Sequence, residues 1–174
     1  MRRNQALLIM NMQVDFLTHG SLVEVPGAKI IVPSLVREIR KAHRRNMPVI
    51  YILDCHKKND PDFKLYPRHA VIDTPGQAII DELSPRSDDI LIEKNTYSAF
   101  YQSNLESRLR GLKVNHLVIT GIPTETDILY TAVDAFMRGM KVSVPEDCVH
   151  GMNSDVHNYA LIQLRDVLKS HVNT

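Results

Sequence analysis

The segment 117–127 places an acidic side chain where a charged or reacting group would be well supported. Its residues are Leu-Val-Ile-Thr-Gly-Ile-Pro-Thr-Glu-Thr-Asp. The apolar run predicts a buried strand, the following residues a tight turn, and the next stretch a helix over Glu125–Met140. A helix N-terminus carries partial positive charge, which stabilises an anion. Asp127 therefore lies where a nucleophile would be well placed.

Strand and helix patterns alternate along the whole chain. The expected strands are Ala6–Met10, Pro48–Leu53, Asp89–Ile92, His116–Thr120 and Lys141–Val144. The other expected helices are Ala28–Asn46, with its regular part from near Ile31, Gln77–Leu83, Phe100–Leu112, and Ser154–Leu168 with Ser154 as N-cap. This alternation predicts one α/β domain over residues 1–174, a three-layer α/β/α arrangement around a parallel sheet of five or six strands. Ligands of such folds bind at the carboxyl ends of the strands.

Composition and charge exclude several classes of protein. The 174 residues are 44% hydrophobic and 24% charged, which is ordinary for a globular domain. The net charge of +1 gives no electrostatic reason to expect nucleic acid or membrane partners. We see no signal peptide and no apolar run of about 18 residues. Two cysteines are too few for a disulfide scaffold, so we expect a cytoplasmic protein.

Three motifs resemble those of the isochorismatase-like hydrolases, a superfamily that includes nicotinamidases, N-carbamoylsarcosine amidases and isochorismatases. Residues 11–16, Asn-Met-Gln-Val-Asp-Phe, are similar to the family pattern Asp-x-Gln-x-Asp-Phe. Residues 94–100 contain a lysine followed by Tyr-Ser-Ala-Phe, and 117–127 resemble the family's strand–turn–helix. The resemblance covers nearly the whole chain and implies an isochorismatase-like, Rossmann-like fold.

The family's amidases use an Asp–Lys–Cys triad, which the resemblance aligns with Asn11, Lys94 and Asp127. Only the lysine is retained. An amide such as Asn11 has no basic pKa suited to general-base catalysis. Considered alone, Asn11 could equally be a polar strand-end residue that satisfies backbone groups.

Pro123 is a third departure, because the family often has Gly-Val-Ala-Thr where this chain has Gly-Ile-Pro-Thr. The resemblance implies a cis peptide before residue 123, which proline favours. Proline also lacks the backbone N–H that forms half of the family's oxyanion hole. Losing one such donor costs about 2.7–4 kcal/mol in acyl-transfer enzymes. Thiol-based amide hydrolysis is therefore not expected.

The charges at the three triad positions still sum to zero. A resting family site holds Asp⁻, Lys⁺ and a neutral thiol, whereas this chain offers Asn11, Lys94⁺ and Asp127⁻. We expect a Lys94–Asp127 ion pair with Asn11 as a hydrogen-bonding neighbour. Cys55 and Cys148 stand near other strand ends, and we interpret them as small buried hydrophobes and not as replacement nucleophiles.

The long loop 54–76 is similar to the metal-binding segment of nicotinamidases. Asp54, His56 and His69 would bind a divalent metal (zinc, iron or manganese), since one carboxylate and two imidazoles can form a three-ligand site. The alternative is that they are polar loop residues near a strand end. The family's substrate pocket would be lined by Phe16, Tyr66, Tyr97, Ile122 and Pro123. For the aromatic residues, the alternative is ordinary packing.

Two functions remain open at this point. The first is a protein of this family that has lost thiol chemistry and keeps a pocket for a small-molecule ligand. The alternative is a divergent, non-covalent hydrolase of a small metabolite that uses Asp127 and Lys94, as the isochorismatase branch also lacks the cysteine. A third candidate is a metal–water hydrolase that uses Asp54, His56 and His69. The family also implies a homo-oligomer, a dimer or tetramer.

Overall fold

A six-stranded, entirely parallel sheet forms the centre of the molecule. The computed structural model describes residues 4–173. The strands are β1 (Gln5–Met10), β2 (Val49–Asp54), β3 (Ile90–Lys94), β4 (His116–Gly121), β5 (Lys141–Pro145) and β6 (His171–Asn173). They are ordered β3-β2-β1-β4-β5-β6, and every neighbouring pair is parallel. The expected parallel α/β fold is confirmed.

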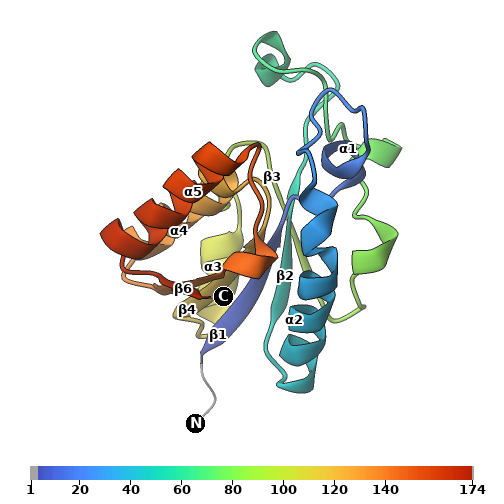
Figure 1. The fold of residues 1–174 in the computed structure, drawn as a ribbon. Coiled ribbons are helices and arrows are strands. Elements are labelled where there is room, and N and C mark those ends of the chain that lie inside the picture. The colour runs from blue at the N-terminus through green and yellow to red at the C-terminus, as the bar shows by residue number, and fades with distance from the viewer. Residues whose placement is uncertain (1–3, 174) are drawn as a thin grey trace.

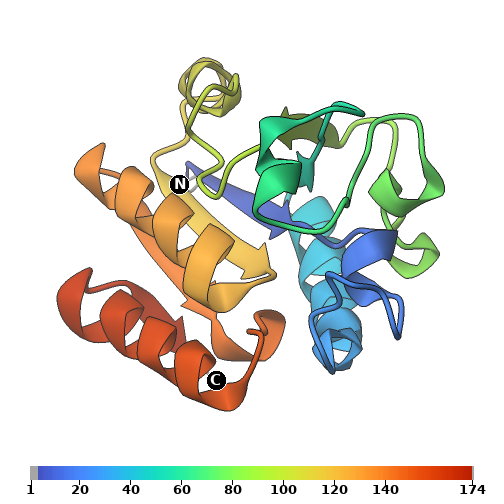
Figure 2. The same ribbon diagram turned by 90° about the horizontal axis from the view of Figure 1, so that it is seen from above.

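Helices cover both faces of the sheet and complete three layers. They are α1 (Val14–Leu17), α2 (Val32–Arg44), α3 (Leu105–Gly111), α4 (Leu129–Met137) and α5 (Ser154–Ile162). Figures 1 and 2 show α2 on one side of the sheet, with α4 and α5 side by side on the other. Alternate residues of β1 enter two separate cores: Leu8 packs toward α3, α4 and α5, and Leu7 toward α2. The chain reverses its winding direction beside β1, so the carboxyl ends of β1 and β4 flank the position where ligands bind in such sheets.

The predicted helix Gln77–Leu83 is wrong. This segment pairs with the chain just after β1, through an antiparallel bridge between Gln13 and Ile79. The backbone N–H of Val14 donates to Ala78 O (2.9 Å), and that of Ile80 donates to Met12 O (3.1 Å). These partners replace the helical hydrogen bonds that the sequence pattern suggested.

Other helix boundaries differ from the prediction for local reasons. The helix predicted from Phe100 begins only at Leu105, because Gln102 has a left-handed backbone (φ +49°). The helix predicted to end at Met140 ends at Met137, with Gly139 in the left-handed conformation (φ +71°) just beyond it.

The cap of α5 and the sixth strand also correct the prediction. The N-cap is Asn153, not Ser154: its side chain accepts hydrogen bonds from the N–H groups of Asp155 and Val156. The strand His171–Asn173 was not identified in the sequence, since three residues are too short to show a pattern. Within residues 4–173, no helix combines the length and apolar character needed to cross a membrane.

Candidate functional site

Four polar side chains meet at the carboxyl edge of the sheet, toward the top of Figure 1. Asn11 follows β1, Asp54 ends β2, Lys94 ends β3, and Asp127 lies in a π-helical turn (Thr124–Ile128) between β4 and α4. All four are buried, with exposed fractions of 1%, 8%, 4% and 5%, respectively. Charged side chains are rarely buried without partners. Their contacts therefore decide what this site can do.

Asp127 accepts hydrogen bonds on both of its carboxylate oxygens. Lys94 Nζ donates to its Oδ1 (2.6 Å), and so does Asn11 Nδ2 (2.8 Å). The hydroxyl of Thr126 donates to Oδ2 (3.0 Å). The structure thus brings the three triad-aligned residues together, with an ion pair and an amide neighbour arranged as the charges suggested.

Lys94 also forms an ion pair with Asp54, which was predicted only as a metal ligand. One buried ammonium therefore lies between two carboxylates. The three side chains together carry a net charge of −1, whereas the triad positions alone sum to zero. The sequence alone did not predict this extra negative charge beside Lys94, because Asp54 and Lys94 become neighbours only through the pairing of β2 with β3.

The pKa shifts follow from this burial and pairing. Burial alone would lower the pKa of Lys94, but Asp127 and Asp54 outweigh it and raise that pKa above its ordinary value. Burial raises the pKa of the Asp127 carboxyl; Asp54 adds to this, while Lys94 and Asn11 oppose it. Lys94 therefore keeps its proton at neutral pH.

The backbone shape at the site explains two residue types. Asn11 adopts a left-handed backbone (φ +54°), which asparagine tolerates better than most residues. At the end of β4, a Cβ on Gly121 would lie 2.1 Å from the backbone oxygen of Met10, so only glycine lets β1 and β4 approach this closely. The peptide bond between Ile122 and Pro123 is cis.

Asp54, His56 and His69 form a compact cluster beside Lys94. Each offers one ligand atom, and these atoms all lie within 4.8 Å of one another. The three side chains are buried, and the two imidazole rings are 4.5 Å apart between centroids. The spacing fits the coordination of one divalent ion by one carboxylate and two imidazoles.

The surroundings of the histidines suit metal ligation. His69 Nδ1 lies 2.7 Å from Pro67 O and can only donate to it, which leaves Nε2 unprotonated in the neutral ring. His56 Nδ1 lies 3.3 Å from a carboxylate oxygen of Asp60. Metal-binding histidines characteristically have a carbonyl or carboxylate beside the other ring nitrogen. The residues present therefore fit a divalent metal.

Gln13 and Asp15 hold these elements in position, a role that was not predicted from the sequence. The side-chain amide of Gln13 donates to Asp54 O and accepts from Asp54 N–H, both at 2.8 Å. Asp15 Oδ2 accepts from Ala70 N–H (2.8 Å), the residue after His69. The match of Gln13 and Asp15 to the family pattern was the sequence feature that could have indicated this role. Both residues fasten the segments that carry the candidate metal ligands.

The five residues predicted to line a substrate pocket differ in their burial. Phe16 is buried with its ring 5.6 Å from that of His69, and Ile122 is fully buried in the α2-side core. Tyr66 and Tyr97 are exposed and share a hydrogen bond between their hydroxyls (2.6 Å). Pro123 precedes the π-helical turn. A pocket that uses these residues stays a prediction.

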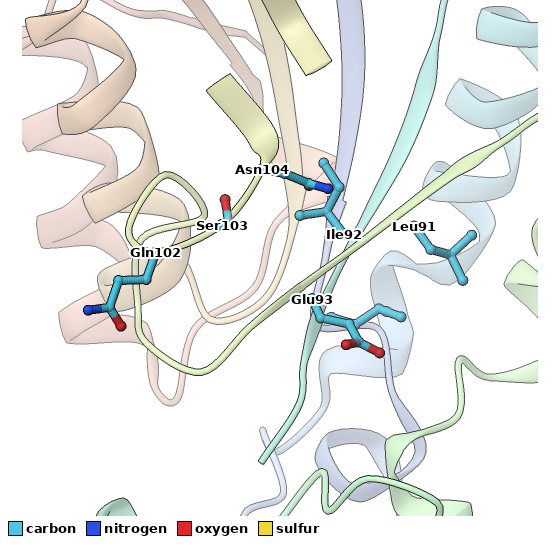
Figure 3. Close-up of a pocket in the computed structure, with 7 residues that line it drawn as sticks. Leu91, Ile92, Glu93, Gln102, Ser103 and Asn104 are labelled. Atoms are coloured by element: carbon cyan, nitrogen blue, oxygen red, sulfur yellow. The ribbon is translucent and has the colours of Figure 1, made fainter. Parts of the chain in front are cut away.

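A surface hollow of about 400 Å³ lies beside the edge strand β3 and not over the buried triad positions. Figure 3 shows that Leu91 and Glu93 come from the strand, and that Gln102, Ser103 and Asn104 come from the loop before α3. None of the predicted pocket residues lines it.

Neither cysteine is placed or activated as a nucleophile. Burial, with Glu93 nearby, raises the pKa of the Cys55 thiol to about 11. Burial also raises the pKa of the fully buried Cys148 to about 12. Both thiols are therefore protonated at neutral pH, and the thiolate is the reactive form.

Residues 5–172 match the isochorismatase domain family. This chain belongs to that family. It is 31% identical over 176 residues to a protein of Arabidopsis thaliana named as a probable inactive nicotinamidase, covering 95% of this chain and 90% of the relative.

Solved structures of the family share the fold. An isochorismatase-like hydrolase from Alkaliphilus metalliredigens is 29% identical, with a TM-score of 0.93 over 98% of this chain and 94% of its own. The pyrazinamidase of Pyrococcus horikoshii, solved in complex with zinc, is 28% identical, with a TM-score of 0.90 over 97% and 98% of the two chains. The isochorismatase-like α/β fold is therefore established for this protein.

Proposed function

We propose that this protein is an isochorismatase-family ligand-binding protein that lacks the thiol amidase chemistry of its relatives. The observation that carries the proposal is the state of Asp127, whose carboxylate is held by Lys94 and Asn11 at the position aligned with the family's cysteine. A carboxylate already engaged by an ammonium is a poor nucleophile. Asn11 also supplies no base to accept a proton. The name of the Arabidopsis relative agrees with this proposal.

The ligand would be a small molecule with a hydrogen-bond donor. Among the described residues, Asn11 Oδ1 is buried without a hydrogen-bond partner. An unpaired buried acceptor is costly, and an N–H or O–H of a ligand would satisfy it. Asp54, His56 and His69 would hold a divalent metal beside this position. Such an ion, when bound, acts as a Lewis acid that polarises oxygen groups of a ligand.

An activity screen tests the loss of thiol chemistry. The wild-type protein is incubated with nicotinamide and other small amides, and we expect no turnover above buffer. Turnover of nicotinamide by the wild-type protein would refute the proposal.

A second experiment tests the loss of thiol chemistry by restoring the base and the thiol. In the double variant Asn11→Asp/Asp127→Cys, we expect the thiol at position 127 to react with iodoacetamide much faster than in the single variant Asp127→Cys. The reason is that a carboxylate base at position 11 can take the thiol proton. Equal labelling rates would show that position 11 does not act on position 127. Pro123 still lacks its N–H, so restored amidase activity is expected to be small.

The second candidate is a non-covalent hydrolase that uses Asp127 and Lys94. The upward shift of the Asp127 pKa favours it, since a general acid works best with a pKa near the operating pH. Isochorismate is the substrate to test. Turnover that is lost in Asp127→Asn would support this candidate over simple ligand binding.

A further inference from the structure

Lys94 connects the residue in the nucleophile position to the candidate metal ligands. Its ammonium contacts Asp127 Oδ1 (2.6 Å) on one side and Asp54 Oδ1 on the other. The lysine side chain has no exposed surface. The ammonium therefore has no solvent to replace a lost carboxylate, and its positive charge depends on these two partners.

The Asp54 carboxylate takes part in two sets of interactions, one with Lys94 and one with the candidate metal ligands. One oxygen accepts from Lys94, and the same carboxylate is the only acidic member of the cluster with His56 and His69. If Lys94 had no other partner, its charge would neutralise Asp54 and compete directly with a bound cation. Asp127 provides the second negative charge, so the ammonium is paired without using the whole charge of Asp54.

We propose that Asp127 is a positioning residue for the metal site: by pairing with Lys94, it leaves Asp54 available to bind a divalent cation. This inference rests on the metal site included in the proposed function. It assigns a role to the carboxylate that replaces the family's nucleophile. With Asp127, the connected side chains carry a net charge of −1; with an uncharged residue there, they would carry zero. A divalent cation binds more tightly to the negative cluster.

Metal titration of four proteins tests the proposal. Zn²⁺ and Mn²⁺ are titrated by calorimetry into metal-free wild type, Asp127→Asn, Lys94→Met and the double variant, with circular dichroism to confirm folding. Asp127→Asn is expected to weaken binding by about 10–100-fold, the range seen when a residue supporting a metal ligand is changed. Lys94→Met should bind metal at least as tightly as wild type, because the competing ammonium is gone.

The double variant shows whether the effect passes through Lys94. Without the ammonium, a buried Asp127 takes up a proton, so Lys94→Met/Asp127→Asn should bind metal like Lys94→Met alone. Asp73→Asn is the matched control, since it removes one negative charge from an exposed position of the same loop. It should leave the metal affinity unchanged.

The outcomes separate this inference from the proposed function. If wild type and Asp127→Asn bind metal equally, the role of Asp127 is refuted while the metal site stands. If Asp127→Asn weakens metal binding by the same factor when Lys94 is replaced by Met, its effect does not act through Lys94 and the proposal is refuted. The same holds if Asp73→Asn weakens metal binding as much as Asp127→Asn does. If the wild-type protein binds neither ion, the metal site and this inference both fail, whereas the proposed loss of thiol chemistry is unaffected. Lys94→Met keeps the proposal testable if Asp127→Asn does not fold, because weaker binding by Lys94→Met would contradict it.

Discussion

At the scale of single residues, the site is defined by how buried charges are paired. Lys94 is enclosed by two carboxylates, and Asp127 accepts from three donors. A buried charge without a partner costs several kcal/mol, so each of these residues depends on the others. The pairing leaves the Asp127 carboxylate engaged by donors, which fits binding better than nucleophilic attack.

Removal of the central ammonium should destabilise the protein. We expect Lys94→Met to lower the free energy of unfolding by about 3–5 kcal/mol in metal-free buffer, because Asp54 loses its charged partner and the buried Asp127 must take up a proton. Urea denaturation at neutral pH measures the change. Lys57→Met, an exposed lysine in the long loop, is the control and should change stability by less than about 0.5 kcal/mol. Equal stability of Lys94→Met and wild type would mean that the ion pairs contribute little.

Thiol labelling tests whether either cysteine is activated. Cys55 should react with iodoacetamide more slowly than free cysteine at pH 8, and its rate should keep rising up to about pH 11, because its raised pKa leaves little thiolate at lower pH. Cys148 should react only after unfolding, since it is fully buried. Peptide mass spectrometry follows both sites separately. Fast labelling of Cys55 at pH 7 would reveal an activated thiol and reopen the question of a substitute nucleophile.

At the scale of elements, strand ends carry Asn11, Asp54 and Lys94, and the start of a helix carries Asp127. The chain leaves β4 through Gly121 and enters a π-helical turn, which places Asp127 on the turn that faces Lys94. Single π-helical turns are rare and occur often at functional sites. A regular helix from Glu125, as the sequence suggested, would have given Asp127 a different direction.

The start of α5 offers a direct test of helix capping. Asn153→Ala should lower the free energy of unfolding by about 1 kcal/mol, because the side chain of Asn153 accepts from two helix N–H groups. Ser154→Ala is the matched control at the neighbouring position and should be close to neutral. Chemical denaturation of the three proteins measures the difference. A larger loss in Ser154→Ala would restore the cap predicted from the sequence.

At the scale of the whole molecule, α4 and α5 lie on the same face of the sheet and both carry exposed apolar side chains. Phe136 and Met137 of α4 are 50% and 68% exposed, and Tyr159 and Ile162 of α5 are 61% and 45% exposed. The two helices lie side by side (Figure 2). Apolar surface of this kind often marks a protein–protein interface.

We propose that a second copy of the chain covers this surface, in line with the homo-oligomer that the family implies. Light scattering should give two or four times the chain mass of 19.8 kDa. Phe136→Asp should shift the protein toward the monomer, because a charge would be buried in the interface. Leu22→Asp, an exposed apolar position near α1, is the control and should leave the mass unchanged. A wild-type mass of 19.8 kDa would contradict the proposal.

The sequence by itself determined the class of fold and the family. Alternating strand and helix patterns act over short distances, so the parallel sheet and most element positions could be inferred from neighbouring residues. The motifs around Asn11, Lys94 and Asp127 likewise indicated which side chains would meet. Segment 77–83 could not be assigned correctly, because its hydrogen-bond partners follow β1, more than 60 residues earlier in the chain.

Only the tertiary structure decided how the charges are shared. Asp54 and Lys94 are 40 residues apart and become neighbours because β2 pairs with β3. Their contact joins two sets of residues that were predicted separately from the sequence, the triad-aligned residues and the candidate metal ligands, into one cluster around a single ammonium. Electrostatic energy depends on distance and burial, and neither quantity is contained in the order of the residues. The residue types were thus readable from the sequence, whereas the connection of Asp127 through Lys94 to the candidate metal ligands required the fold.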